Sequence, residues 1–210
     1  MRKLLLTAAV VTAFTAALAM SAVAAGTCGI CGKNLIKNPG AEAGRGVMAV
    51  GAFGAVPGWT IAAGQFGAAS YAFPNGWFSA RSKGPKARRK NYFFGGTTTT
   101  AVEAGASIGT QTVALPAAAA GRKATLSGWL GNYVENRAQV RAEFKDASGK
   151  VLSTLRIGPA VTISGTDLAL RSRSGKVPAG ARQVTISVIF SGGGANYKLA
   201  GADNLALVLT

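Results

Sequence analysis

The sequence predicts an all-β fold, in which two antiparallel sheets pack face to face as a β-sandwich of the jelly-roll type. Several segments alternate apolar and polar residues, which is the pattern of a strand with one buried face. Turns that contain glycine or proline separate these segments, and no segment after residue 25 keeps the 3.6-residue apolar period of an amphipathic helix. Many short strands joined by such turns are typical of two-sheet sandwiches.

The N-terminal residues have the pattern of a secretory signal peptide. A basic start, Met1 to Lys3, precedes an uncharged run from Leu4 to Met20, and small residues from Ser21 to Ala25 then form a cleavage site. A retained membrane anchor is the alternative, but the apolar run is barely long enough to cross a bilayer. We therefore expect residues 1–24 to be removed and the protein to be secreted, either outside the cell or at its envelope, with no transmembrane segment in the remainder.

Two cysteines, Cys28 and Cys31, lie in a short segment, residues 25–33, that precedes the expected sandwich domain at 34–210. Export to an oxidising compartment favours a disulfide between them. A redox motif of this spacing would have to begin a helix within a βαβ unit, and the sequence after Cys31 is extended instead. We therefore expect a small structural disulfide loop.

The strand candidates follow one another along residues 34–210. The clearest alternation, over 137–145, leads through a turn at 146–149 into Val151 to Ile157, so the two segments should form a hairpin with one solvated face. Apolar residues also alternate from Val184 to Phe190 and from Leu205 to Leu209. The other candidates are Gly58 to Ala62, Phe66 to Phe73, Asn91 to Phe94, Ser107 to Leu115 and Lys123 to Tyr133.

The charge balance is strongly basic, with 23 Lys and Arg against 7 Asp and Glu and a formal net charge of +16. Such an excess favours anionic partners, such as acidic glycans, cell-wall polymers, anionic lipid head groups or nucleic acid. The alternative is that the charge serves solubility alone.

The composition excludes most catalytic mechanisms. The chain has no histidine, which removes Ser-His-Asp and Cys-His nucleophile systems and histidine-based zinc sites. The seven acidic residues form no close motif that would suggest the carboxylate pair of a glycosidase. A polysaccharide lyase that acts on uronates is the remaining enzyme alternative, with Tyr133 as the base and Arg137 and Arg141 neutralising the uronate. We therefore predict a protein that is not an enzyme.

Two motifs at opposite ends of the domain resemble those of a known superfamily. The segment from Asn34 to Glu42, followed by Pro57-Gly58-Trp59-Thr60, resembles the opening of secreted carbohydrate-binding modules of the galactose-binding-like β-sandwich superfamily. The segment from Ala202 to Leu207 resembles their closing strand. The resemblance implies a galactose-binding-like jelly roll whose first and last strands lie side by side. It does not identify the ligand, because the superfamily also contains modules that bind proteins and lipids. Ala41 departs from the family, in which an aromatic residue is common there.

The same resemblance implies a structural calcium ion held by Glu42 and Asp203. Calcium takes six to eight oxygen ligands, so backbone carbonyls near Asn38 and Gly40 would have to complete the shell. The alternative is that Glu42 meets a nearby arginine and that Asp203 caps a turn.

The segment from Lys123 to Tyr133 provides the candidate ligand platform. Its alternation places leucines on the core face, with Trp129 and Tyr133 on the solvent face. If this segment forms a hairpin with the next strand, three polar residues of that strand lie on the same side. Aromatic rings beside guanidinium groups suit an acidic sugar, which stacks on the ring while arginine binds its carboxylate or sulfate. The alternatives are that a loop covers Trp129 or that a slip of register buries it. The predicted ligand-binding residues are Trp129, Tyr133, Arg137, Gln139 and Arg141.

A second candidate is the run of basic residues between positions 81 and 90. Basic residues interleaved with aromatics can hold single-stranded nucleic acid. Here the aromatics lie outside the charged run and Gly84-Pro85 interrupts it, so we favour a solvated loop over nucleic-acid binding; an electrostatic anchor to an anionic polymer is the alternative. The basic run consists of Arg81, Lys83, Lys86, Arg88, Arg89 and Lys90.

Together these observations predict a secreted, non-catalytic carbohydrate-binding module for an anionic or cell-envelope polysaccharide. The first alternative is a structural or adhesive envelope protein that is held electrostatically to acidic polymers. The second alternative is the uronate lyase.

Overall fold

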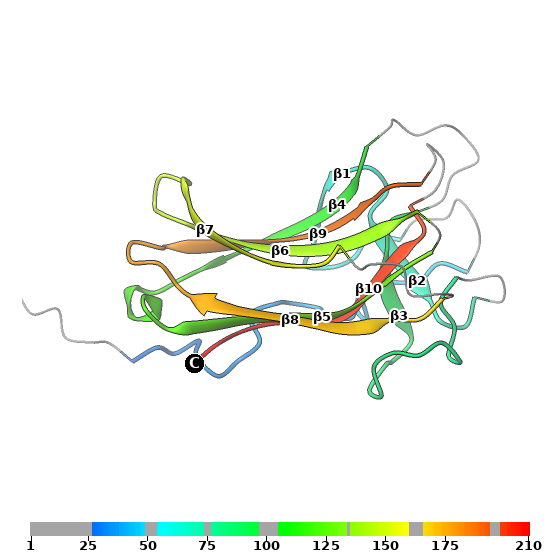
Figure 1. The fold of residues 1–210 in the computed structure, drawn as a ribbon, viewed down its shortest axis with the longest axis horizontal. Coiled ribbons are helices and arrows are strands. Elements are labelled where there is room, and N and C mark those ends of the chain that lie inside the picture. The colour runs from blue at the N-terminus through cyan, green and yellow to red at the C-terminus, as the bar shows by residue number, and fades with distance from the viewer. Residues whose placement is uncertain are drawn as a thin grey trace, which may run out of the picture.

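The computed structural model describes residues 27–48, 54–73, 77–96, 105–133, 135–159, 166–193 and 198–210. The predicted signal peptide lies outside these residues. Within them, the chain forms ten strands in two five-stranded antiparallel sheets, which lie one above the other in Figure 1. This confirms the predicted all-β sandwich. In the described part of the chain, no helix is long and apolar enough to cross a membrane.

Each sheet draws strands from both halves of the chain. The first, which we call the β6 sheet, has the order β1 (Thr60–Ala63), β4 (Ser107–Ala114), β9 (Gln183–Ser191), β6 (Arg137–Lys145) and β7 (Val151–Ile157). The second, which we call the β5 sheet, has the order β2 (Gly67–Ser70), β3 (Asn91–Phe94), β10 (Ala200–Leu209), β5 (Lys123–Asn132) and β8 (Ala169–Lys176). A 3₁₀ turn at Ala117–Ala119 connects β4 to β5.

The core lies between the two sheets and follows the alternation of the sequence. In β6, Val140 and Phe144 are fully buried, and in β5 Leu126 and Leu130 are fully buried opposite them. Each such side chain stabilises the fold by about 1.5–3 kcal/mol through removal of apolar surface from water. The predicted hairpin of β6 and β7 is confirmed, because Val140 pairs with Ile157.

The expected pairing of the 123–133 segment with the strand that follows it is wrong. β5 pairs with β8 and β10, whereas β6 pairs with β7 and β9 in the other sheet. The chain crosses from one sheet to the other between Tyr133 and Arg137, so that the apolar sides of β5 and β6 face each other across the core. The alternation of the sequence did not indicate β8, whose only exposed large apolar residue is Leu170.

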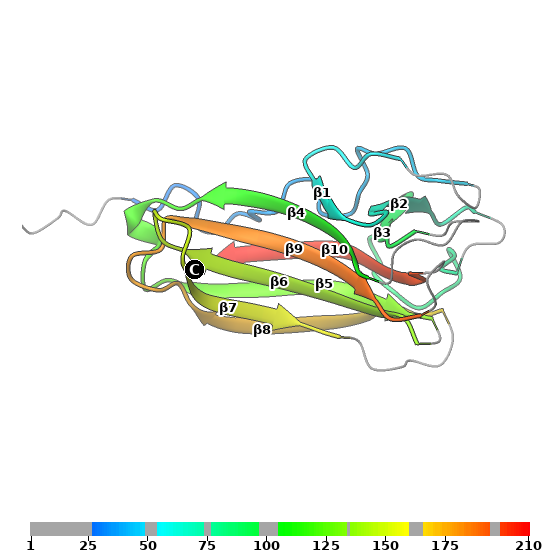
Figure 2. The ribbon, with the colours of Figure 1, turned by 90° about the horizontal axis from the view of Figure 1, so that it is seen from above.

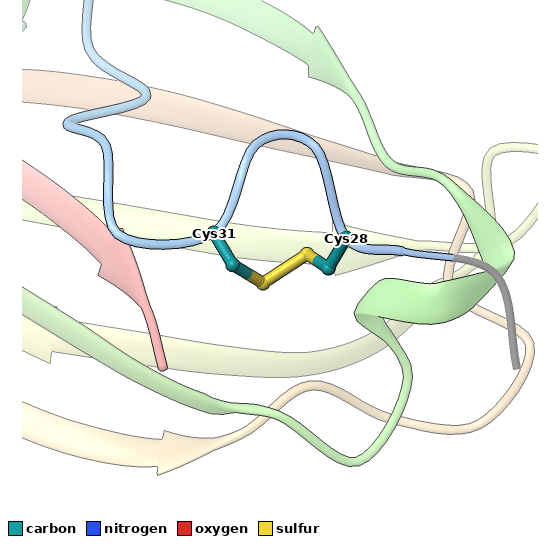
Figure 3. The surroundings of a disulfide bond; sticks show 2 residues. All are labelled: Cys28 and Cys31. Carbon is teal, nitrogen blue, oxygen red and sulfur yellow. A yellow bond between two sulfur atoms is a disulfide. The ribbon is translucent and has the colours of Figure 1, made fainter.

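The N-terminal segment lies along the last strand, as the resemblance implied, although it forms a single bridge there rather than a strand (Figure 1). The Asn34 amide donates to the carbonyl of Leu205 at 2.9 Å, and its oxygen accepts the N–H of Leu207 at 3.0 Å. The predicted disulfide between Cys28 and Cys31 is present and closes a short loop just before this segment (Figure 3).

Candidate functional site

The outer side of the β5 sheet carries a second hydrophobic cluster, separate from the core. Tyr92 and Phe94 point outward from β3, and the segment after β2 folds over them, so that Phe78 is fully buried. Phe78 meets the ring of Tyr92 edge-on at 5.3 Å between centroids. Side chains of β3 and of the segment after β2 therefore pack together behind the residues at the margin of this cluster.

Trp129 lies at that margin, on the outward side of β5. It is paired in register with Leu170 of β8 and Asp203 of β10. Its indole is half-buried against the second cluster, while the neighbouring Leu170 is 55% exposed. The loop therefore covers Trp129 only in part, and the indole is not enclosed between the sheets. Tyr133 is 36% exposed just beyond the end of β5.

The three polar residues predicted beside Trp129 lie on the opposite side of the sandwich. Arg137, Gln139 and Arg141 alternate with the buried residues of β6 and therefore face outward from the β6 sheet. Figure 2 shows that sheet from above, with β4, β9, β6 and β7 side by side. The predicted ligand set is thus divided between two faces, because β5 and β6 belong to different sheets.

The outer face of the β6 sheet also contains a basic residue that sequence reasoning missed. Arg156 of β7 pairs in register with Arg141 of β6. Glu143 lies between two cations of the same strand, with its carboxylate 3.5 Å from Arg141 Nε and 3.5 Å from Lys145 Nζ. The signal for Arg156 was available, since the correctly predicted β6–β7 hairpin places it across from Arg141.

The members of the basic run after β2 have different surroundings. Arg88 is turned inward, donating to the carbonyls of Ser79 at 2.6 Å and Ser82 at 2.5 Å, and its guanidinium lies 5.0 Å from the centre of the Tyr71 ring. Lys83 forms an ion pair with Asp167 at 4.0 Å. The other members, Arg81, Lys86, Arg89 and Lys90, are exposed.

The two acidic residues predicted to hold calcium lie close to Gly40. A Cβ at Gly40 would be 3.0 Å from Asp203 Oδ1, 3.5 Å from Asn204 Oδ1 and 3.7 Å from Glu42 Cγ. These are carboxylate and amide groups, whose oxygens are the ligands that calcium prefers. The chemistry of the donors therefore fits the ion, although the described residues contain no group of three or more acidic, histidine or cysteine side chains that could hold a metal. The carbonyl of Asn38 already accepts two hydrogen bonds, from Ala41 N and Trp59 Nε1.

Both carboxylates also have protein partners. Glu42 accepts the backbone N–H groups of Lys90 at 3.1 Å and Asn91 at 2.9 Å, rather than meeting an arginine. Asp203 is 1% exposed and accepts the Tyr71 hydroxyl at 2.9 Å and the Asn204 N–H at 2.7 Å.

These surroundings change the acidity of Asp203 and Tyr71. Burial raises the pKa of Asp203 to about 6, and the nearby Glu42 adds to this effect, while the hydrogen bonds from Tyr71 and Asn204 oppose it. Burial, followed by the charge of Asp203, also raises the pKa of Tyr71, so its hydroxyl remains a donor. The pair thus forms a buried hydrogen bond between segments 132 residues apart.

Comparison with known proteins shows the fold and leaves the family open. No protein-family model matches the chain, and no curated protein matches it. Among solved structures, the enzymatically active domain of tailspike protein 4 from bacteriophage CBA120 matches with a TM-score of 0.57 and 16% identity, over 84% of this chain and 21% of that one. TmCBM61 in complex with β-1,4-galactotriose matches with a TM-score of 0.48 and 18% identity, over 85% and 99% of the two chains. The xylan-binding domain CBM22-1 of Paenibacillus barcinonensis Xyn10C gives a TM-score of 0.41 and 13% identity, over 72% and 85%. This chain therefore spans about a fifth of the tailspike chain, with which it shares the β-sandwich fold.

Proposed function

We propose that this chain is a secreted, non-catalytic module that binds polysaccharide, at the cell envelope or outside the cell, by stacking a sugar ring on Trp129. The observation that carries the proposal is the half-buried indole on the outward side of β5, beside the exposed Leu170. The resemblance of the first and last segments to galactose-binding-like modules supports the same function.

The position of Trp129 suits stacking for a physical reason. One side of the indole packs on the second hydrophobic cluster, which holds the ring in place before any ligand arrives. A preorganised ring loses little side-chain entropy on binding, so more of the contact energy contributes to affinity. The apolar C–H face of a sugar fits such a ring, and the basic net charge favours an acidic polymer.

A polysaccharide array with Trp129→Ala tests the proposal, with Trp77→Ala as the matched control. Trp77 is also half-buried against the second cluster, where it stacks on Phe94 at 5.2 Å between centroids. Both variants therefore remove indole from the same cluster. We expect Trp129→Ala to weaken binding at least about tenfold, which corresponds to about 1.4 kcal/mol, and Trp77→Ala to retain it. A folded Trp129→Ala protein that binds every hit unchanged would contradict the proposal.

An adhesive envelope protein held by charge alone is the second candidate function. The exposed basic residues of the segment after β2, such as Lys86 and Arg89, favour it. Salt separates the two functions, because screening weakens contacts between exposed charges whereas stacking on Trp129 survives. Binding that disappears completely at high ionic strength would favour the adhesive function.

The non-catalytic part of the proposal is tested by incubating the protein with uronate polymers. A lyase would produce an unsaturated uronate and a rise in ultraviolet absorbance. Such a rise that depends on the exposed Tyr133 would replace the binding proposal with the lyase. We expect the absorbance to stay flat.

A structural calcium ion is also part of this proposal. Glu42 and Asp203 would hold it, with the Asn204 side-chain oxygen beside them. The ion would offset the repulsion between the two carboxylates and would tie the N-terminal segment to β10.

A further inference from the structure

Two arginines lie directly opposite each other on the outer face of the β6 sheet. Arg141 of β6 and Arg156 of β7 are cross-strand partners, and both side chains point away from the core. Arg156 is exposed, and the side chain of Arg141 is 33% exposed. Like charges at directly opposed positions destabilise a sheet. A cross-strand arginine pair therefore destabilises the fold unless an anion binds to it.

The surrounding charges do not neutralise this pair. Glu143 is the only acidic residue of β6 and β7, and it also lies 3.5 Å from Lys145. Arg137 adds a further cation at the start of β6. The outer face of these two strands therefore carries four cations, Arg137, Arg141, Lys145 and Arg156, against one carboxylate.

The hydrogen-bonding capacity of Arg141 is also incomplete. Its Nε is buried and makes no hydrogen bond, although it lies 3.5 Å from a carboxylate oxygen of Glu143. A buried donor without a hydrogen-bond acceptor destabilises the folded state, and more so when it is charged. An incoming anion would bind the exposed part of the Arg141 guanidinium and would also relieve the repulsion from Arg156.

Hydroxyl groups extend the same row across the sheet. Ser187 of β9, the other cross-strand partner of Arg141, is only 4% exposed. Beyond it, Thr110 of β4 pairs with Ser187 and Thr60 of β1 pairs with Thr110, and both threonines are at least partly exposed. Neighbouring strands are about 4.8 Å apart, so the row from β7 to β1 is roughly 19 Å long. Figure 2 shows β4, β9, β6 and β7 of this sheet side by side. A row with cations at one end and threonine hydroxyls at the other matches a chain of sugars that carries an acidic group.

We infer that the outer face of the β6 sheet binds an acidic polysaccharide, with Arg141 and Arg156 together holding one carboxylate or sulfate group. Arginine suits this role because its planar guanidinium forms two parallel hydrogen bonds to an oxyanion. The inference rests on the proposed function, because it names the chemical class of the polysaccharide. Its binding face is separate from that of Trp129.

Dextran, carboxymethyl dextran and dextran sulfate test the inference, because they share one backbone and differ in the acidic group. We expect the Arg141→Gln/Arg156→Gln protein to bind the two acidic dextrans at least about tenfold more weakly than the wild type, a loss of about 1.4 kcal/mol. Lys86→Gln/Arg89→Gln is the matched control, because it removes the same charge from the segment that covers the other sheet. The control should bind within about twofold of the wild type.

A charge reversal, Arg156→Glu, separates a binding role from a structural one. The new carboxylate would pair with Arg141, so the variant should unfold at a higher temperature than the wild type and yet lose binding to acidic dextran. Arg89→Glu, its control, should do neither.

The outcomes distinguish this inference from the proposed function. Equal weakening by the two glutamine pairs would mean that net charge acts rather than this face, which overturns the inference. Binding of neutral and acidic dextran alike, without dependence on Arg141 and Arg156, would also overturn it while the proposed function stands. Tighter binding of duplex DNA than of either acidic dextran, with the same arginine dependence, would replace the polysaccharide with nucleic acid. A protein that binds no polysaccharide of any class would refute the proposed function itself.

Discussion

Asp203→Asn should stabilise the protein at neutral pH, even though it changes a residue that is 1% exposed and makes two hydrogen bonds. Burial, with the added repulsion of Glu42, raises the pKa of Asp203 to about 6 from its ordinary value of 3.8. Because one pKa unit corresponds to 1.36 kcal/mol, ionisation of Asp203 in the folded state opposes folding by about 3 kcal/mol. Asparagine has no charge to bury, and it can keep both contacts, because its oxygen accepts the Asn204 N–H and its amide donates to the Tyr71 oxygen.

The sign of the pH dependence follows from linkage. The folded protein holds a proton on Asp203 more tightly than the unfolded chain does, so the contribution of this residue to stability is present below about pH 4 and is lost as the pH rises through 6. The advantage of Asp203→Asn should therefore be near zero at about pH 4 and should reach about 2–3 kcal/mol at about pH 8.

Urea unfolding of both proteins in the presence of a chelator, at several pH values, measures this difference directly. Asp146→Asn is the matched control, since hydrogen bonds from Ser148 and the N–H of Lys150 lower the pKa of Asp146. That substitution should destabilise the protein above the pKa of Asp146, which is the opposite direction. A free-energy difference for Asp203→Asn that is independent of pH, or that is unfavourable at every pH, would refute the reasoning.

Three further predictions concern the calcium site, the core and the basic segment. Excess calcium should raise the melting temperature of the wild type and leave that of Asp203→Asn unchanged, as thermal denaturation would show; an equal rise in both would exclude Asp203 as a ligand. Gly109→Ala should destabilise the protein by about 1–3 kcal/mol in urea unfolding, because the new Cβ would overlap the buried ring of Phe66; an unchanged midpoint would show that this ring can move aside. Arg88→Lys should expose the segment over the second hydrophobic cluster to proteolysis, because lysine cannot reach the carbonyls of Ser79 and Ser82 together. A protease pattern identical to that of the wild type would show that these two hydrogen bonds are not needed to hold the segment in place.

The alternation of apolar and polar residues correctly predicted strands that are buried on one side only. The segments 137–145 and 151–157 are strands with the expected bounds, and in β6 every second, apolar residue is buried. The segment 91–94 also has the expected bounds, although it is buried on both sides. The sequence pattern did not indicate β8, because this strand lies at the edge of its sheet and buries few apolar side chains on its interior side. Arg171 and Arg173 occupy that side, opposite Gly128 and Leu126 of β5.

The candidate site was less predictable, because its contacts join residues far apart in the sequence. The Tyr71–Asp203 hydrogen bond spans 132 residues, and nothing near either residue indicates it. Arg88 looks like any other member of a basic run until the turn around it places two carbonyls and the Tyr71 ring within its reach.

The separation of an aromatic face from a cationic face follows from one crossing of the chain. Alternation along β5 and β6 directs Trp129 and Arg141 away from the core, whichever sheet each strand joins. Topology then decides which outward residues become neighbours, and consecutive strands in opposite sheets expose their polar sides in opposite directions. The turn between Tyr133 and Arg137, closed by hydrogen bonds from Asn136 to the Tyr133 carbonyl, is therefore the element that keeps the two faces apart. If both proposals hold, a short acidic oligosaccharide would occupy only one face at a time, whereas a long polymer would contact both by passing around an edge of the sandwich or by bridging two copies of the chain.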